Sequence, residues 1–152
     1  MDKMQMLVLG LVLFLGIHST RIVAEGWRGR AIAAIGEMRW KGLVSLVSLA
    51  GFVLLVWGFG QARSDTVALW TPPAGMRHLA ALLTVPAFIL LVAAYVPRNA
   101  IRARLRHPMV LGVKTWALAH LLANGLLAHV LLFGAFLAWS VLLFAASRRR
   151  DR

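Results

Sequence analysis

The sequence lacks cysteine and has few acidic residues. No cysteine occurs among its 152 residues, so disulfides, thiolate nucleophiles and cysteine-ligated metals are excluded. Only five residues are acidic, and none of them lies in a long apolar stretch: Asp2, Glu25, Glu37, Asp65 and Asp151. A hydrolase with paired carboxylates and an intramembrane carboxylate proton relay are therefore excluded. Ligand chemistry is left to histidine.

What the sequence has in abundance is apolar side chains. They make up 61% of the chain, against about 45 to 50% in soluble domains. They form blocks long enough to cross a bilayer, and we predict spans at about residues 4–24, 43–60, 76–96, 109–123 and 126–146. The first block resembles a signal-peptide core, but no small-x-small cleavage pattern follows it, so we expect it to be retained. The predicted fold is an all-α polytopic transmembrane bundle, one domain over residues 1–152.

Two features inside these blocks shape the predicted helices. Pro86 lies in the middle of the third span, where we expect it to kink the helix. The stretch 109–146 is too long for one crossing, and Asn124-Gly125 divides it, because Asn-Gly is a strong turn signal.

The basic residues predict how the spans are oriented. The net charge is +12, and thirteen Lys and Arg fall in the segments 19–42 and 97–108 and in the tail 148–152, whereas Lys3, Arg63 and Arg77 lie on the complementary side. Lys114 lies inside the fourth span, from which it can snorkel toward the cytoplasm. Five spans place all three basic segments in the cytoplasm beside anionic lipid headgroups, with the N-terminus outside. Charge distributed in this way does not indicate nucleic-acid binding.

The first basic segment also contains a helical pattern. Ala31, Ile32, Ile35 and Met38 recur at helical spacing. This pattern fits either a short helix on the membrane surface or an irregular basic loop.

Two of the five histidines are the strongest candidates for a buried ligand. His18 and His120 lie deepest in the predicted spans, and a neutral imidazole there binds iron or zinc. The pair suits axial ligation of haem, and the alternative is that each forms a hydrogen bond to a neighbouring helix. At about 1.5 Å per residue, His107 matches the depth of His18 better than His120 does, so it remains a rival ligand. His78, His129 and His120 are a weaker candidate for a three-histidine zinc site.

Two further sets of residues accompany the histidines. Trp116, His120 and Asn124 recur every four residues and form one stripe on a helix, in which Asn124 either orients His120 or only makes the turn. Arg98, Arg102, Arg104 and Arg106, with Arg21 from the first basic segment, concentrate donors at the cytoplasmic surface. They suit haem propionates, phosphate or a carboxylated ligand, or they serve only to set the topology.

Four motifs resemble those of the NnrU-like membrane proteins of bacteria, a family that includes 15-cis-zeta-carotene isomerase. They are Leu-Gly-Ile-His-Ser at 15–19, Leu-Trp-Thr-Pro-Pro at 69–73, Arg-His-Pro at 106–108 and Trp-Ala-Leu-Ala-His-Leu-Leu-Ala-Asn-Gly at 116–125.

The resemblance implies a multi-pass protein of the bacterial inner membrane, linked to nitrite and nitric oxide metabolism in denitrifying bacteria. In the isomerase branch it implies a haem b that isomerises a polyene, with axial histidines at His18 and His120. The alternative cysteine ligand of the isomerase falls at Ala117, so a Cys-for-His switch is excluded here. Members of the family usually continue into a further apolar segment, whereas this chain stops at Arg152.

Two other functions remain open at this point. An accessory membrane protein that assembles or supplies a nitrogen-oxide reductase needs no catalytic residues of its own. A membrane methyltransferase of the isoprenylcysteine type is suggested by Arg-x-Arg-His-Pro-x-x-x-Gly at 104–112. That enzyme needs acidic residues in a later helix, and only Asp151 follows Asp65. Whether the protein is an enzyme is left open.

Overall fold

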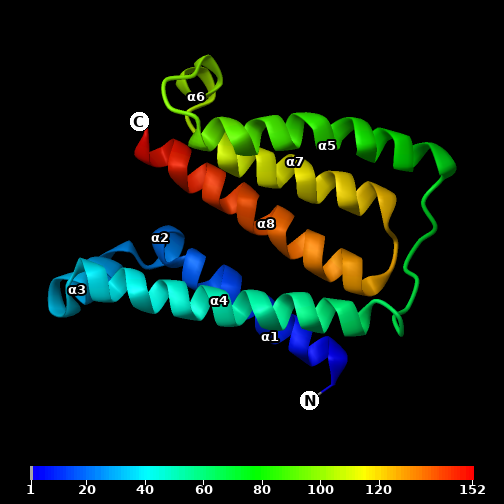
Figure 1. Ribbon diagram of the computed structural model, residues 1–152, viewed down its shortest axis with the longest axis horizontal. Coiled ribbons are helices and arrows are strands. Elements are labelled where there is room, and N and C mark those ends of the chain that lie inside the picture. The colour runs from blue at the N-terminus through cyan, green and yellow to red at the C-terminus, as the bar shows by residue number, and fades with distance from the viewer. Residues whose placement is uncertain (1) are drawn as a thin grey trace. The chain divides into compact units, whose positions relative to one another are not determined.

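The chain is all-helical, as predicted. A computed structural model describes residues 2–152, in which eight helices and one isolated β-bridge occur. The helices are α1 (Lys3–His18), α2 (Thr20–Val23), α3 (Glu25–Ile35), α4 (Glu37–Ala62), α5 (Ala74–Tyr95), α6 (Ala100–Leu105), α7 (Pro108–Ala123) and α8 (Leu127–Arg150) (Figure 1). Contacts between Cα atoms divide the chain into two compact units, here called unit 1 (residues 2–66) and unit 2 (Val67–Arg152).

Three helices have the length and composition of membrane spans. Helices α4, α5 and α8 contain 26, 22 and 24 residues and are strongly apolar, so each exceeds the roughly 20 residues that cross a bilayer. Their outward faces carry large apolar side chains; Leu46 and Leu82 are 69% and 70% exposed. These features support a membrane protein. Helices α1 and α7 contain 16 residues each, or about 24 Å, and the count of five spans stays a prediction.

The predicted first span, 4–24, is not one helix. Helix α1 ends at His18, and the short helix α2 follows after Ser19. The Ser19 hydroxyl donates to the Leu15 carbonyl at 2.6 Å, and the Thr20 hydroxyl donates to the Ile17 carbonyl at 2.9 Å. Hydroxyls that bond to nearby carbonyls in this way compete with the backbone bonds of a helix, which the hydropathy of the block does not reveal.

The first basic segment, for which the sequence left a short surface helix or an irregular loop open, contains a short helix. It is α3, and it ends at Gly36, whose φ of 87° lies in the left-handed region that favours glycine. Met38 therefore belongs to the next helix, α4, which begins six residues before the predicted span 43–60. The rings of Trp27 on α3 and Trp40 on α4 pack edge to face, with their centroids 5.7 Å apart.

In unit 1, α1 and α4 pack as an antiparallel pair in which backbone touches backbone. A Cβ added at Gly51 would lie 2.7 Å from the Phe14 nitrogen, and one at Gly10 would lie 2.6 Å from the Leu55 Cα. A Cβ added at Gly58 would overlap the Leu7 nitrogen. Small residues that allow such approach are typical of helix pairs in membranes, where burying apolar side chains gives no advantage over lipid.

In unit 2, α7 is the central helix. It packs against α5 on one side and α8 on the other (Figure 1). On the α5 side, a Cβ at Gly112 would lie 2.9 Å from the Ala87 carbonyl oxygen. The third predicted span is confirmed as a helix, and α5 continues unbroken through Pro86.

Asn124-Gly125 ends α7 as predicted, but not as a two-residue turn. Asn124 has φ −136° and ψ 126°, and the extended backbone that follows pairs with the segment before α5. The Leu69 nitrogen donates to the Gly125 carbonyl and the Leu127 nitrogen to the Val67 carbonyl, both at 2.8 Å. A side chain at position 125 would overlap the Trp70 carbonyl. Glycine is needed here for close approach of backbone, not for a left-handed φ.

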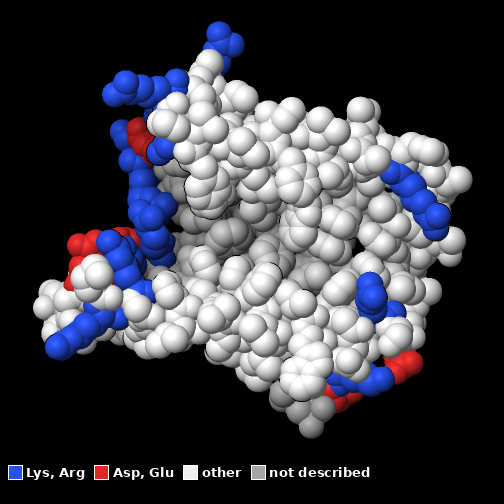
Figure 2. All heavy atoms as spheres, in the orientation of Figure 1, with Lys and Arg blue, Asp and Glu red and all other residues white. Residues whose placement is uncertain are grey.

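Charged side chains gather at the helix ends of each unit, and the surface along the helices is largely uncharged (Figure 2). At one end of unit 1 Lys3 forms an ion pair with Asp65. Within unit 2, the basic segment 97–108 and the tail lie at the same end, where His107 meets Asp151. Lys114 extends its amine toward that end, 5.8 Å from the centre of the Phe144 ring, as expected for a snorkelling lysine.

The glycine contacts of α4 give a testable prediction with a matched control. Gly→Ala inside a helix normally stabilises by up to about 1 kcal/mol, and Gly60→Ala should do so, because nothing lies within 4 Å of its added Cβ. Gly58→Ala should instead destabilise by about 1–3 kcal/mol. Unfolding in detergent followed by circular dichroism measures both. Equal changes in the two variants would contradict the close α1–α4 contact.

Candidate functional site

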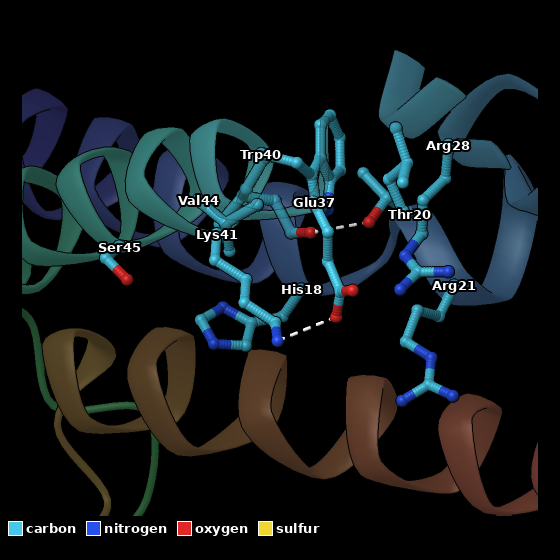
Figure 3. Close-up of a pocket in the computed structure, with 11 residues that line it drawn as sticks. His18, Thr20, Arg21, Arg28, Glu37, Trp40, Lys41, Val44 and Ser45 are labelled. Atoms are coloured by element: carbon cyan, nitrogen blue, oxygen red, sulfur yellow. Dashed lines mark hydrogen bonds and ion pairs between the residues drawn. The ribbon is translucent and has the colours of Figure 1, made fainter. Parts of the chain in front are cut away.

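A cavity in unit 1 lies where α1 ends and α4 begins. Its volume is about 480 Å³, and α3 and the α1–α3 connection complete its wall (Figure 3). It is lined by Ile17, His18, Thr20, Arg21, Arg28, Ile32, Glu37, Trp40, Lys41, Val44 and Ser45. We refer to it below as the His18 pocket.

His18 is held in one orientation by its own helix. Its Nδ1 lies 2.6 Å from the Phe14 carbonyl oxygen, and a carbonyl only accepts, so Nδ1 carries the proton. In the neutral ring the lone pair is then on Nε2. The Phe14 ring packs against the imidazole at 4.5 Å between centroids. A backbone carbonyl on one ring nitrogen is the usual support for a histidine that binds a metal through the other.

The charges around the His18 pocket are mainly positive. Arg21, Arg28 and Lys41 contribute cations, against Glu37 on the same wall. Lys41 pairs with Glu37 at 2.7 Å, one helical turn apart, as Figure 3 shows. Arg28 pairs with Glu25 at 3.0 Å. The pocket therefore suits a ligand that combines an apolar body with acidic groups.

The apolar part of the wall comes from α3 and α4. Trp40 is only 5% exposed, and it packs against Trp27, which ties α3 to α4. Ile32 and Val44 add aliphatic surface.

In unit 2, the predicted stripe on α7 is part of an aromatic cluster. The His120 ring stacks on Phe133 of α8, with centroids 4.2 Å apart and planes inclined by 6°. The Trp116 ring packs edge to face with the rings of His120 and Phe133, with centroids 5.2 and 5.1 Å apart. The Asn124 side-chain amide donates to the His120 backbone carbonyl at 2.9 Å. This hydrogen bond caps the end of α7 and does not involve the imidazole.

The basic end of unit 2 contains the remaining predicted residues. His107 Nε2 lies 2.8 Å from an Asp151 oxygen, and Arg106 lies 3.9 Å from the same oxygen. Arg102 donates to the Ala94 carbonyl at 3.4 Å. The hydrogen bond with His107 is the main reason why the pKa of Asp151 is lowered from its ordinary value of 3.8, and Arg106 and Arg148 lower it further.

The predicted residues thus fall into three groups. His18 and Arg21 share the His18 pocket, Trp116 and His120 share the aromatic cluster, and His107 and Arg106 meet Asp151. The structure contradicts the weaker candidate, a zinc site made by His78, His120 and His129. Nowhere in residues 2–152 do three histidine or acidic side chains lie close enough together to hold a metal ion.

Sequence reasoning missed several residues of these groups. Trp40 and Lys41 were missed because they lie just before the predicted start of the second span. The four-residue spacing of Glu37 and Lys41, which suits an ion pair on a helix, could have indicated that the helix begins earlier. Phe133 had no local signal, because its partner His120 lies on another helix.

Comparison with known proteins identifies the chain over nearly its whole length. The sequence profile of the family described as NnrU protein matches residues 6–152, a range that covers the His18 pocket and all of unit 2. No curated protein and no solved structure matches the chain.

The lowered pKa of Asp151 predicts a pH-dependent stability. A carboxylate whose folded pKa is depressed stabilises the fold above its ordinary pKa of 3.8, and this stabilisation is lost as the pH falls through the folded pKa. Below about pH 4, the melting temperature of wild type should therefore fall more steeply with pH than that of Asp151→Asn. Parallel pH profiles for the two proteins would show that the His107–Asp151 contact does not stabilise the fold.

Proposed function

Because the chain belongs to the NnrU family, we propose that it is a multi-pass protein of the bacterial inner membrane that binds haem b. In this proposal it acts in nitrite and nitric oxide metabolism or in a redox-type isomerisation. The observation that carries the proposal is the imidazole of His18, fixed by the Phe14 carbonyl in a cavity with an apolar wall and a cationic lining.

The residues of the His18 pocket fit haem b in three respects. Because Nδ1 of His18 donates to the Phe14 carbonyl, Nε2 is the nitrogen that would bind iron. Trp40 and Val44 provide an apolar surface for the macrocycle. Arg21, Arg28 and Lys41 provide the cations that bind propionates.

When bound, haem b would supply an iron that exchanges single electrons and that the protein's side chains would ligate. The protein's own residues bind and orient it. The Phe14 carbonyl keeps the His18 proton on Nδ1, and the Phe14 ring restricts rotation of the imidazole. Trp40, buried between α3 and α4, keeps water from that side of the cavity.

From the family resemblance, His120 would be the second residue to ligate the haem iron. Within unit 2 its ring is fixed between Phe133 and Trp116. His107 is the rival ligand, and its Nε2 is engaged with Asp151, which favours His120. Both assignments are open to the same spectroscopic test.

The proposal predicts a Soret band in the protein purified after haem supplementation. His18→Ala should abolish the band or shift it from a six-coordinate to a five-coordinate form. The matched control is His78→Ala, because His78 is exposed at the start of α5, and this variant should keep the wild-type spectrum. His120→Ala and His107→Ala, measured in parallel, separate the two candidate second ligands.

The cations of the pocket give a second readout. Loss of a charge-assisted hydrogen bond, worth about 1.5–3 kcal/mol, should weaken haem binding by about tenfold or more in Arg21→Gln or Lys41→Gln. Haem titration measures this change. A Soret band that survives unchanged in His18→Ala, or that is absent from the folded, haem-supplemented wild type, would refute the proposed function.

A further inference from the structure

A second cavity lies in unit 2, on the outward face of α5 where the chain turns into α6. Its volume is about 420 Å³. It is lined by Phe88, Ile89, Val92 and Val96 on one side and by Asn99 and Ile101 on the other. We refer to it as the α5–α6 groove. It shares no residue with the His18 pocket and has no part in the proposed haem site.

The floor of the groove is an apolar face of a candidate membrane span. Phe88, Ile89 and Val92 are 54%, 51% and 59% exposed, and α5 is long enough to cross a bilayer. In a membrane such a face lies against acyl chains.

Asn99 closes one end of the groove by fixing α6 to α5. Its amide donates to the carbonyls of Ala93 and Val96 at 2.9 and 2.6 Å. Its side-chain oxygen accepts a hydrogen bond from the Arg102 nitrogen at 2.8 Å and so caps α6. The position of α6 is therefore set by a polar network and not by apolar packing alone.

Arginines occupy both ends of α6 in an unusual backbone conformation. Arg98 and Arg106 have φ values of 52° and 60°, and among residues 2–152 they are the non-glycine residues with positive φ. Residues with side chains rarely adopt positive φ. They keep it where surrounding contacts hold the backbone in place, often at ligand sites. Here Arg98 lies in the connection from α5 to α6, directly before the groove residue Asn99, and Arg106 lies in the connection from α6 to α7.

Two arginines flank the groove residues in the chain. Arg98 precedes Asn99 and Arg102 follows Ile101, and the Arg102 guanidinium lies 3.4 Å from the carbonyl oxygen of Ala94, the residue after the lining residue Ala93. No acidic residue occurs between Asp65 and Asp151, and Asp151 is paired with His107 and Arg106. Figure 2 shows basic side chains gathered at the end of unit 2 where α6 lies.

We propose that the α5–α6 groove binds an anionic phospholipid. One acyl chain lies along Phe88, Ile89 and Val92, and Arg98 and Arg102 bind the phosphate. Guanidinium groups match phosphate geometry and can bind it through two hydrogen bonds, and basic pockets beside membrane helices are typical sites for anionic lipid headgroups. An apolar polyene would match the apolar floor of the groove, but it would give the neighbouring arginines no anionic partner.

The experiment compares two lipids with identical dioleoyl chains, phosphatidylglycerol and phosphatidylcholine, by native mass spectrometry of the detergent-solubilised protein. Wild type should retain phosphatidylglycerol at least about tenfold more strongly, the effect of one charge-assisted contact. The double variant Arg98→Gln, Arg102→Gln should lose this preference. Its control, Arg149→Gln in the exposed tail, should keep it.

A second variant tests the groove without touching the charges. Ile89→Trp should fill the groove and lower phosphatidylglycerol retention, whereas Leu82→Trp, on the same helix but outside the groove, should not. Circular dichroism checks that each variant is folded. Equal retention of the two lipids by wild type would overturn the proposal. So would retention unaffected by Ile89→Trp, because the arginines would then attract lipid without a groove.

Discussion

Close backbone contact at glycine is the interaction on which the rest of the structure depends. In lipid, apolar side chains gain little by leaving one apolar environment for another, so helices associate where their backbones approach closely. In unit 1 this contact is made by Gly10, Gly51 and Gly58, and in unit 2 by Gly112 and Gly125. Each contact fixes a register as well as a pairing, because a shift along the helix would place a side chain where only backbone fits.

The register of α1 against α4 determines the His18 pocket. With Gly51 against Phe14, His18 lies one turn further along α1, level with about Val47 of α4, and it shares a pocket with Trp40 and Lys41. The Phe14 carbonyl then orients the imidazole. In unit 2 the same principle places α7 against α5, and aromatic contacts hold His120 to α8. The chemistry of each unit therefore depends on where its glycines lie.

The sequence was sufficient to predict the helical class and the break at Asn124-Gly125, because hydropathy and turn chemistry are local, whereas it left open whether the segment of α3 is a helix or a loop. It did not predict that Ser19 and Thr20 would end α1 early, or that Gly125 would meet Trp70, because those outcomes depend on competing hydrogen bonds and on distant backbone. Of the candidate sites, His18 and Arg21 were identified by position, whereas Trp40, Lys41 and Phe133 joined them only through contacts between helices.

The predicted orientation places the basic end of each unit in the cytoplasm. Cysteine labelling tests this prediction most directly, because the chain contains no native cysteine. Single cysteines are placed at Ser64, between α4 and α5, and at Ala103, in α6. In spheroplasts, a membrane-impermeant maleimide should label Ser64→Cys directly and Ala103→Cys only after the membrane is permeabilised. Labelling of Ala103→Cys in intact spheroplasts, with Ser64→Cys protected, would contradict the account.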